Sequence, residues 1–109
     1  MSYKPIIIVA GQPNSVFLEI FFKSINSKKY KSPLILIASK KLLLLQMRYF
    51  NFKKKIKILD VNNLKNLNLN NKSINLIDVE YNTKKAFEKI SKKSNVYIKN
   101  SFDIAFKIL

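Results

Sequence analysis

The sequence predicts an α/β protein, with a layered α/β/α fold and a mostly parallel sheet that is incomplete at its C-terminal end. Short apolar runs rich in β-branched residues alternate along the chain with longer stretches of helical periodicity. The runs at 5–10 and 33–38 are apolar throughout, which is typical of parallel strands covered by helices on both faces. A length of 109 residues is enough for one compact domain with a core of its own.

The first strand and the first helix are predicted on either side of a short turn. Residues 5–10 form the strand, the turn follows at 11–14, and Ser15 caps the helix. This helix carries apolar side chains on more than one face, so we expect a further domain or a second subunit to cover part of it. These side chains are Val16, Phe17, Leu18, Ile20, Phe21, Phe22 and Ile25.

A second strand and helix follow the same pattern. Residues 33–38 form a buried strand, and Ser39 caps a helix that runs to about Phe50. Asn51 is the predicted C-terminal residue of this helix, because asparagine tolerates the positive φ of a helix end. Alternating apolar residues at 55–60 predict a third strand nearer an edge of the sheet.

The remainder of the chain is predicted to contain one more strand and two helices. Residues 61–72 repeat Asn and Leu without a clear period and form an irregular connection, and 73–79 form the fourth strand. A helix begins at Thr83, and a break or re-capping point at 94–95 separates it from a last helix that stops where the sequence stops. The apolar faces of these two helices consist of Ala86, Phe87 and Ile90, and of Ile98, Phe102, Ala105 and Leu109.

The positive charge of the chain is interpreted as a property of its composition. The formal net charge is +15, and every basic residue except Arg48 is a lysine. Proteins that read nucleic acids favour the planar, bidentate arginine side chain, whereas Lys, Asn and Ile, which share A/T-rich codons, are abundant here together. No apolar run approaches the ~18 residues of a membrane helix. We therefore expect no nucleic-acid partner, no membrane partner and a cytoplasmic protein.

Missing residue types narrow the chemistry. The chain has no cysteine and no histidine, which excludes disulfides, thiolate metal sites, the usual zinc sites and histidine-based triads. Gly11 is the only glycine, so neither a three-glycine dinucleotide loop nor a P-loop exists. Asp60 and Asp78 fall near strand ends, where a capping role is expected over a paired-carboxylate site. The tyrosines interleaved with lysines are predicted to lie at the surface, namely Tyr30, Tyr49, Tyr81 and Tyr97.

The turn between the first strand and the first helix is the main candidate site. In open α/β sheets, ligands gather beyond the carboxyl ends of the strands, and a helix N-terminus offers free N–H donors to anions. The alternative is a tight turn that needs Gly11 and Pro13 only for its backbone shape. Both interpretations stay open at the level of the sequence.

The residues of this turn resemble the N-terminus of the 4-hydroxythreonine-4-phosphate dehydrogenases. That family opens with a strand followed by Gly-Asp/Glu-Pro-Ala/Ser-Gly-Ile/Val-Gly-Pro-Glu. Gly11, Pro13 and Glu19 match this pattern, and Val16 matches its aliphatic position. Gln12 stands in place of the acidic residue. The two later glycines and the second proline are replaced, and the replacing residues are Ser15, Phe17 and Leu18.

A second stretch carries the same resemblance. Residues 94–98 are similar to the Asn-Gly-aromatic-Val start of a helix in that family, with Val96 in the place of the glycine. The order of strands and helices between the two stretches is also similar. The resemblance spans essentially the whole chain, which would cover about a third of such an enzyme.

The resemblance implies that residues 1–109 are a single N-terminal α/β segment of a larger dehydrogenase-like protein. It implies an NAD-dependent and metal-dependent oxidation and decarboxylation of a small phosphorylated substrate in pyridoxine (vitamin B6) biosynthesis, carried out by a homodimer. The histidines that bind the metal and most of the NAD site would lie downstream. We therefore expect this segment alone to be inactive, to bind neither NAD nor a divalent metal and to hold no catalytic residue. Gln12, Asn14 and Glu19 are the residues expected to line the substrate cleft.

Two further interpretations remain open. A small lysine-rich module that binds nucleic acid or anionic surfaces would show one contiguous lysine face and steeply salt-dependent binding. A degenerate, non-enzymatic relative of the dehydrogenases would keep the fold and the dimer surface without the activity.

Overall fold

The computed structural model describes residues 4–64, 68–89 and 91–109, and it confirms the predicted α/β class. Four parallel strands form one sheet in the order β1-β2-β4-β3. The elements in chain order are β1 (Ile6–Val9), α1 (Phe17–Ser27), β2 (Leu34–Ala38), α2 (Lys40–Tyr49), β3 (Ile56–Ile58), a short 3-10 helix η1 (Val61–Asn63), β4 (Ile74–Asp78) and α3 (Lys92–Ile108).

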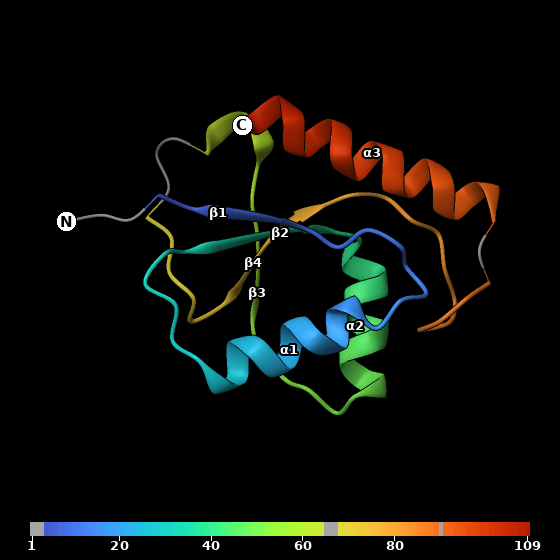
Figure 1. Cartoon of the computed structure of the whole chain (residues 1–109), viewed down its shortest axis with the longest axis horizontal. Coiled ribbons are helices and arrows are strands. Elements are labelled where there is room, and N and C mark those ends of the chain that lie inside the picture. The colour runs from blue at the N-terminus through green and yellow to red at the C-terminus, as the bar shows by residue number, and fades with distance from the viewer. Residues whose placement is uncertain (1–3, 65–67, 90) are drawn as a thin grey trace.

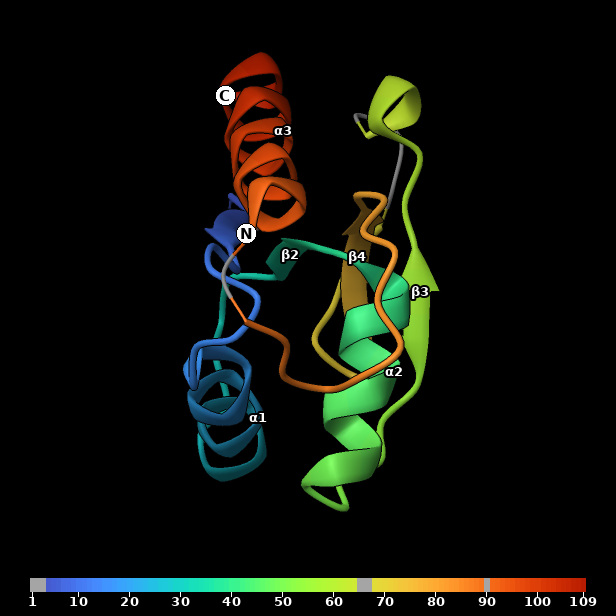
Figure 2. The ribbon, with the colours of Figure 1, turned by 90° about the vertical axis from the view of Figure 1, so that its right-hand side faces the viewer.

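The helices lie in two layers on opposite faces of the sheet. The chain moves in one direction from β1 to β2 and on to β3, and it then reverses to place β4 between β2 and β3. The helices α1 and α2 lie on one face, as expected for right-handed crossovers that run in one direction along the sheet. The helix α3, which follows the last strand, lies on the other face, as Figures 1 and 2 show. α1 contacts α2, and α3 packs across β1 and β2.

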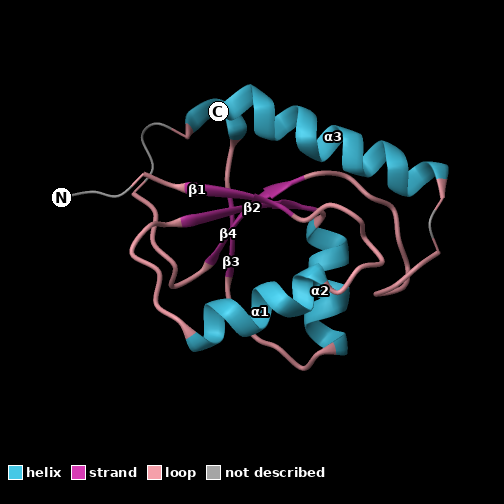
Figure 3. Ribbon diagram, viewed as in Figure 1, coloured by secondary structure: helices cyan, strands magenta, loops and turns pink. Residues whose placement is uncertain are grey.

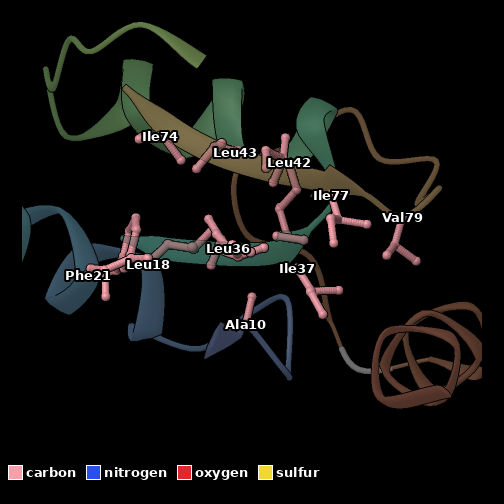
Figure 4. Packing of buried hydrophobic residues seen from close by; sticks show 14 of the residues in the cluster. Ala10, Leu18, Phe21, Leu36, Ile37, Leu42, Leu43, Ile74, Ile77 and Val79 are labelled. Carbon is pink, nitrogen blue, oxygen red and sulfur yellow. The ribbon is translucent and has the colours of Figure 1, made fainter. Parts of the chain in front are cut away.

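The centre of the core is β2, whose residues are all buried. Alternate side chains of β2 point to opposite faces, so that Leu36 packs toward Leu18 and Phe21 of α1, whereas Ile37 points toward α3 (Figure 4). Leu42 and Leu43 of α2 reach the same core beside β4 (Figure 4). The all-apolar run at 33–38 is thus buried on both faces, as its composition predicts.

The first apolar run, at 5–10, contains β1 and is less buried than its apolar composition predicts. β1 pairs only with β2, so its other edge carries no neighbouring strand among the described residues. Ile6 is 48% exposed, and the other residues of β1 are half-buried. Position in the sheet, which composition does not encode, accounts for the difference. The prediction that β3 lies at an edge is confirmed.

Most helix and turn signals in the first half lie where the sequence places them. Ser39 caps α2 by accepting a hydrogen bond from the Leu42 N–H (3.1 Å). Asn51 adopts φ 53° directly after the end of α2, which confirms its predicted C-terminal role. The cap of α1 is one residue later than predicted, at Val16, and the Ser15 hydroxyl accepts from the Phe17 N–H (3.3 Å).

The prediction of two C-terminal helices is wrong. Residues 79–89 form no helix, and one long helix, α3, begins after Ser91 (Figure 3). Ser94 lies in its first turn, where Ser91 and Ser94 form a reciprocal capping box. The capping role expected near 94–95 is therefore present at Ser94, but it belongs to the start of a single helix and not to a junction between two. Ile90, which was assigned to the apolar face of the first helix, lies outside the described residues, as do 65–67 of the predicted irregular connection.

Candidate functional site at the carboxyl edge of the sheet

The predicted site at 11–15 is a compact turn at the carboxyl end of β1. The Ser15 N–H and the Ser15 hydroxyl both donate to the Gln12 carbonyl, at 3.2 and 2.8 Å. Gly11 adopts φ 72°, a conformation that side chains other than that of glycine rarely adopt. A Cβ added to Gly11 would have no atom within 4 Å, so this position requires glycine for its backbone angle and not for space. The backbone geometry expected of a turn at these residues is therefore present.

Gln46 of α2 holds this turn against the segment that follows β4. Its side chain is 1% exposed, and its Nε2 donates to the Pro13 carbonyl (3.0 Å) and to the Ala86 carbonyl (2.8 Å). One amide group therefore joins three segments at the carboxyl edge of the sheet. The contact also explains why 83–89 is not helical, because the Ala86 carbonyl is directed to Gln46.

Three buried polar atoms at this edge have no hydrogen-bond partner among the described residues. They are the Oε1 atoms of Gln12 and Gln46 and the hydroxyl of Tyr81. A buried polar atom without a partner costs free energy, and such atoms favour a site where a polar ligand or water completes the bonding. All three lie on segments that meet at the carboxyl edge of the sheet.

The N-terminus of α2, at the same edge, has three of its backbone N–H groups bonded to side chains, those of Ser39, Lys40 and Leu42. The Lys40 N–H donates to Oδ1 of Asp78 (2.8 Å), and the Ser39 N–H donates to the Tyr97 hydroxyl (2.9 Å). Together with the Ser39 cap, these bonds leave little of this helix end for an anionic ligand. Asp78 thus has the capping role predicted for it, and Asp60 has the same role at η1, where it accepts from the Asn62 N–H (2.9 Å).

Two tyrosines predicted at the surface are buried instead. Tyr81 and Tyr97 are 4% and 1% exposed, and their rings stack with centroids 4.8 Å apart. Lysines near them in the sequence predict exposure, but Tyr97 lies on the buried side of α3, which packs on β1 and β2, and Tyr81 stacks against it. Burial raises the pKa of the Tyr97 hydroxyl to about 12, although its hydrogen bond from Ser39 acts in the opposite direction.

Tyr97 is expected to make the protein less stable at high pH. The pKa of the Tyr97 hydroxyl is about 12 in the folded protein, against an ordinary value of 10.0 that applies to the unfolded chain. The folded state therefore holds this proton more tightly than the unfolded state does. The unfolded state ionises first as the pH rises, and about 2–3 kcal/mol of unfolding free energy is lost between these two pKa values. Denaturant titrations of the parent protein and of Tyr97→Phe at increasing pH measure this loss, which the variant lacks. Tyr49→Phe, at an exposed tyrosine, is the control and keeps the parent's pH dependence.

A polar hollow of about 860 Å³ borders the segment after β4. Glu88 lines it, accepting from the Thr83 hydroxyl and from the Lys84 N–H (3.1 Å) and pairing with Lys93 (3.7 Å). These hydrogen bonds and the lysine charge hold the pKa of the Glu88 carboxyl below its ordinary value. The lining residues are Asn82, Lys84, Lys85, Phe87, Glu88, Lys89, Ser91 and Lys93.

The structure brings together only part of the predicted cleft. Gln12 and Asn14 lie half-buried in the turn at the carboxyl edge. Glu19 lies elsewhere: it pairs with Lys23 (3.1 Å) and lines a separate hollow of about 250 Å³ between α1 and the end of α2. Sequence reasoning missed Gln46, although a lone amide in an otherwise apolar helix stretch, between Leu42 and Met47, was a signal that could have found it.

Comparisons with known proteins add no family. No protein-family model matches the chain, and the search of curated proteins yields no match. Within residues 4–64, 68–89 and 91–109, no helix is long and apolar enough to cross a membrane. The same described residues hold no group of three or more acidic, histidine or cysteine side chains placed to bind a metal ion.

Proposed function

We propose that this chain is the N-terminal α/β segment of an NAD-dependent and metal-dependent dehydrogenase that resembles the 4-hydroxythreonine-4-phosphate dehydrogenases of pyridoxine biosynthesis. The observation that carries the proposal is the turn at 11–15. It joins the carboxyl end of β1 to α1 in an all-parallel sheet, at the edge where such sheets bind ligands. This turn also carries the sequence resemblance.

The half-buried residues of the turn supply polar groups for a substrate. Gln12 and Asn14 carry amide groups, which both donate and accept hydrogen bonds. Gln46 fixes this turn against the segment after β4, so the turn is held in place before a ligand arrives. In this proposal Gln12 and Asn14 contact the small phosphorylated substrate.

The described residues do not fit a metal centre, since they contain no metal-binding group and the chain has no histidine. We therefore assign no chemical step to a metal ion bound by residues of this chain. The metal ligands, most of the NAD site and the second subunit of a homodimer would come from outside these residues. The proposed protein is cytoplasmic.

Growth without pyridoxine tests the proposal. The gene that encodes this chain, with any coding sequence continuous with it, is expressed in a bacterium that lacks its own 4-hydroxythreonine-4-phosphate dehydrogenase. We expect growth without added pyridoxine, and NADH formation by the purified product from 4-phosphohydroxythreonine, NAD and a divalent cation. Failure of both readouts with a folded, soluble product contradicts the dehydrogenase and favours the non-enzymatic relative.

A matched pair of variants connects this result to the turn. Gly11→Asn preserves access to the positive φ of 72°, whereas Gly11→Val does not, because a β-branched residue is strained there. We expect the asparagine variant to support growth and the valine variant to fail or to grow poorly. Equal growth of the two variants would show that the geometry of this turn does not matter for the activity.

A further inference from the structure

Another hollow lies at the opposite edge of the sheet, where the parallel strands begin. We call it the amino-edge hollow; its volume is about 610 Å³, within the range of about 300–1,000 Å³ typical of small-molecule sites. It is enclosed by the end of α1 and the residues after it, by Lys54 two residues before β3, and by the turn before β4, segments that can be followed in Figure 1. Its lining consists of Ile25, Asn26, Ser27, Lys28, Lys29, Tyr30, Lys54, Asn71 and Lys72.

Four lysines gather around this hollow from three separate parts of the chain. Lys28 and Lys29 follow α1, Lys54 precedes β3 and Lys72 precedes β4. None of the lining residues is acidic. The ion pairs within the described residues join Glu19, Glu88 and Asp103 to lysines that do not line the hollow. The four lysine charges at the hollow are therefore not balanced by carboxylates in its wall.

The wall of the amino-edge hollow is fixed by hydrogen bonds. Asn71 accepts from the Leu34 N–H (2.8 Å) and donates to the carbonyls of Tyr30 (3.3 Å) and Ser32 (2.9 Å). The Tyr30 hydroxyl also bonds to the Ser24 hydroxyl. These bonds tie the turn before β4 to the connection between α1 and β2, so the lysines surround the hollow without a rearrangement of the backbone.

The lining of the hollow is mostly polar, since Ile25 and Tyr30 are its only members besides lysine, asparagine and serine side chains. A separate small pocket of about 10 Å³ shares Ile25, Lys54 and Asn71 with it and reaches the core side chains Phe21 and Ile74. Lysine binds phosphate as a point charge, and several lysines around one hollow suit a compact ligand with several negative charges.

We propose that the amino-edge hollow binds a small anion that carries several phosphate charges. The hollow favours a compact ligand over a nucleic-acid strand, because a strand is bound along an extended basic groove and these lysines surround one depression. The amino-edge hollow shares no residue with the turn at 11–15. Anion binding at the hollow therefore does not depend on the proposed dehydrogenase function.

Calorimetric titration of the full chain with inorganic tripolyphosphate in about 0.15 M salt, where the Debye length is about 8 Å, tests the proposal. The test variant replaces all four lysines: Lys28→Gln, Lys29→Gln, Lys54→Gln and Lys72→Gln. The matched control removes the same charge from exposed lysines outside the hollow: Lys40→Gln, Lys57→Gln, Lys92→Gln and Lys107→Gln. Both variants are first shown to be folded by circular dichroism.

We expect the parent to bind about one tripolyphosphate per chain. The dissociation constant should rise at least about tenfold in the test variant and less than about threefold in the control. Salt screens the attraction between tripolyphosphate and distant lysines, whereas lysines in contact with the bound phosphates are screened much less. Equal weakening in the two variants would show a general charge effect and overturn the proposal. Absence of saturable binding by the parent, or tighter binding of a single-stranded oligonucleotide that tripolyphosphate does not displace, would overturn it as well.

Discussion

Replacing Gln46 with glutamate is expected to lower the free energy of unfolding by about 3–5 kcal/mol at neutral pH. The parent amide donates from Nε2 to the carbonyls of Pro13 and Ala86, and its side chain is 1% exposed. A carboxylate at this position faces two carbonyl oxygens with no hydrogen to donate, and its charge is buried without a partner. Urea denaturation followed by circular dichroism measures the loss.

The pH dependence identifies the cause of this loss. Burial raises the pKa of the new carboxyl group, so protonation restores one donor and the deficit relative to the parent narrows as the pH falls. Gln46→Leu is the matched control, because it removes both donors without adding a charge. The leucine variant should lose about 1–3 kcal/mol of unfolding free energy. The loss is partly offset because leucine also removes Oε1, a buried oxygen that has no hydrogen-bond partner in the parent. Equal, small losses in both variants would show that Gln46 does not hold the three segments together.

Replacing Leu43 with alanine is expected to cost about 2–5 kcal/mol of unfolding free energy. Leu43 is 0% exposed and points from α2 into the core beside β4 (Figure 4). Alanine leaves a cavity that the neighbouring strands cannot fill without shifting. Since the total stability of such a domain is about 5–15 kcal/mol, the variant should be close to unfolding at physiological temperature.

The neighbouring residue provides the control for this substitution. Leu44 occupies the same helix but is 46% exposed, so Leu44→Ala changes helix propensity in the same way without opening a cavity. Its cost should stay below about 1 kcal/mol. Thermal melts of both variants measure the difference in Tm. A similar drop in Tm for the two would contradict the burial pattern of α2.

The sequence was sufficient where a local pattern has a single structural solution. The apolar run at 33–38 became a fully buried strand, and Ser39 and Asn51 mark the ends of α2 as their side-chain chemistry predicts. The turn at 11–15 is predictable because Gly11 permits a positive φ, which it adopts, and proline at position 13 restricts the backbone. These signals depend on residues within a few positions of one another.

The sequence failed where the outcome depends on distant contacts. The stretch after Thr83 has helical periodicity, yet the Ala86 carbonyl bonds to Gln46, which is 40 residues away in sequence. The lysines interleaved with Tyr81 and Tyr97 predict a surface position, but the two rings stack on each other on the buried side of α3. In both cases tertiary hydrogen bonding and burial outweigh local propensity.

By itself the sequence determined the α/β class, the parallel strands, the first turn and the capping residues, because periodicity and side-chain chemistry act over short distances. Only the tertiary structure decided which strand is central and which oxygens are buried without partners at the carboxyl edge. It also decided that lysines scattered along the sequence gather at the amino-edge hollow. The order β1-β2-β4-β3 is the physical reason, because it brings together chain segments whose separation in sequence gives no sign of their proximity.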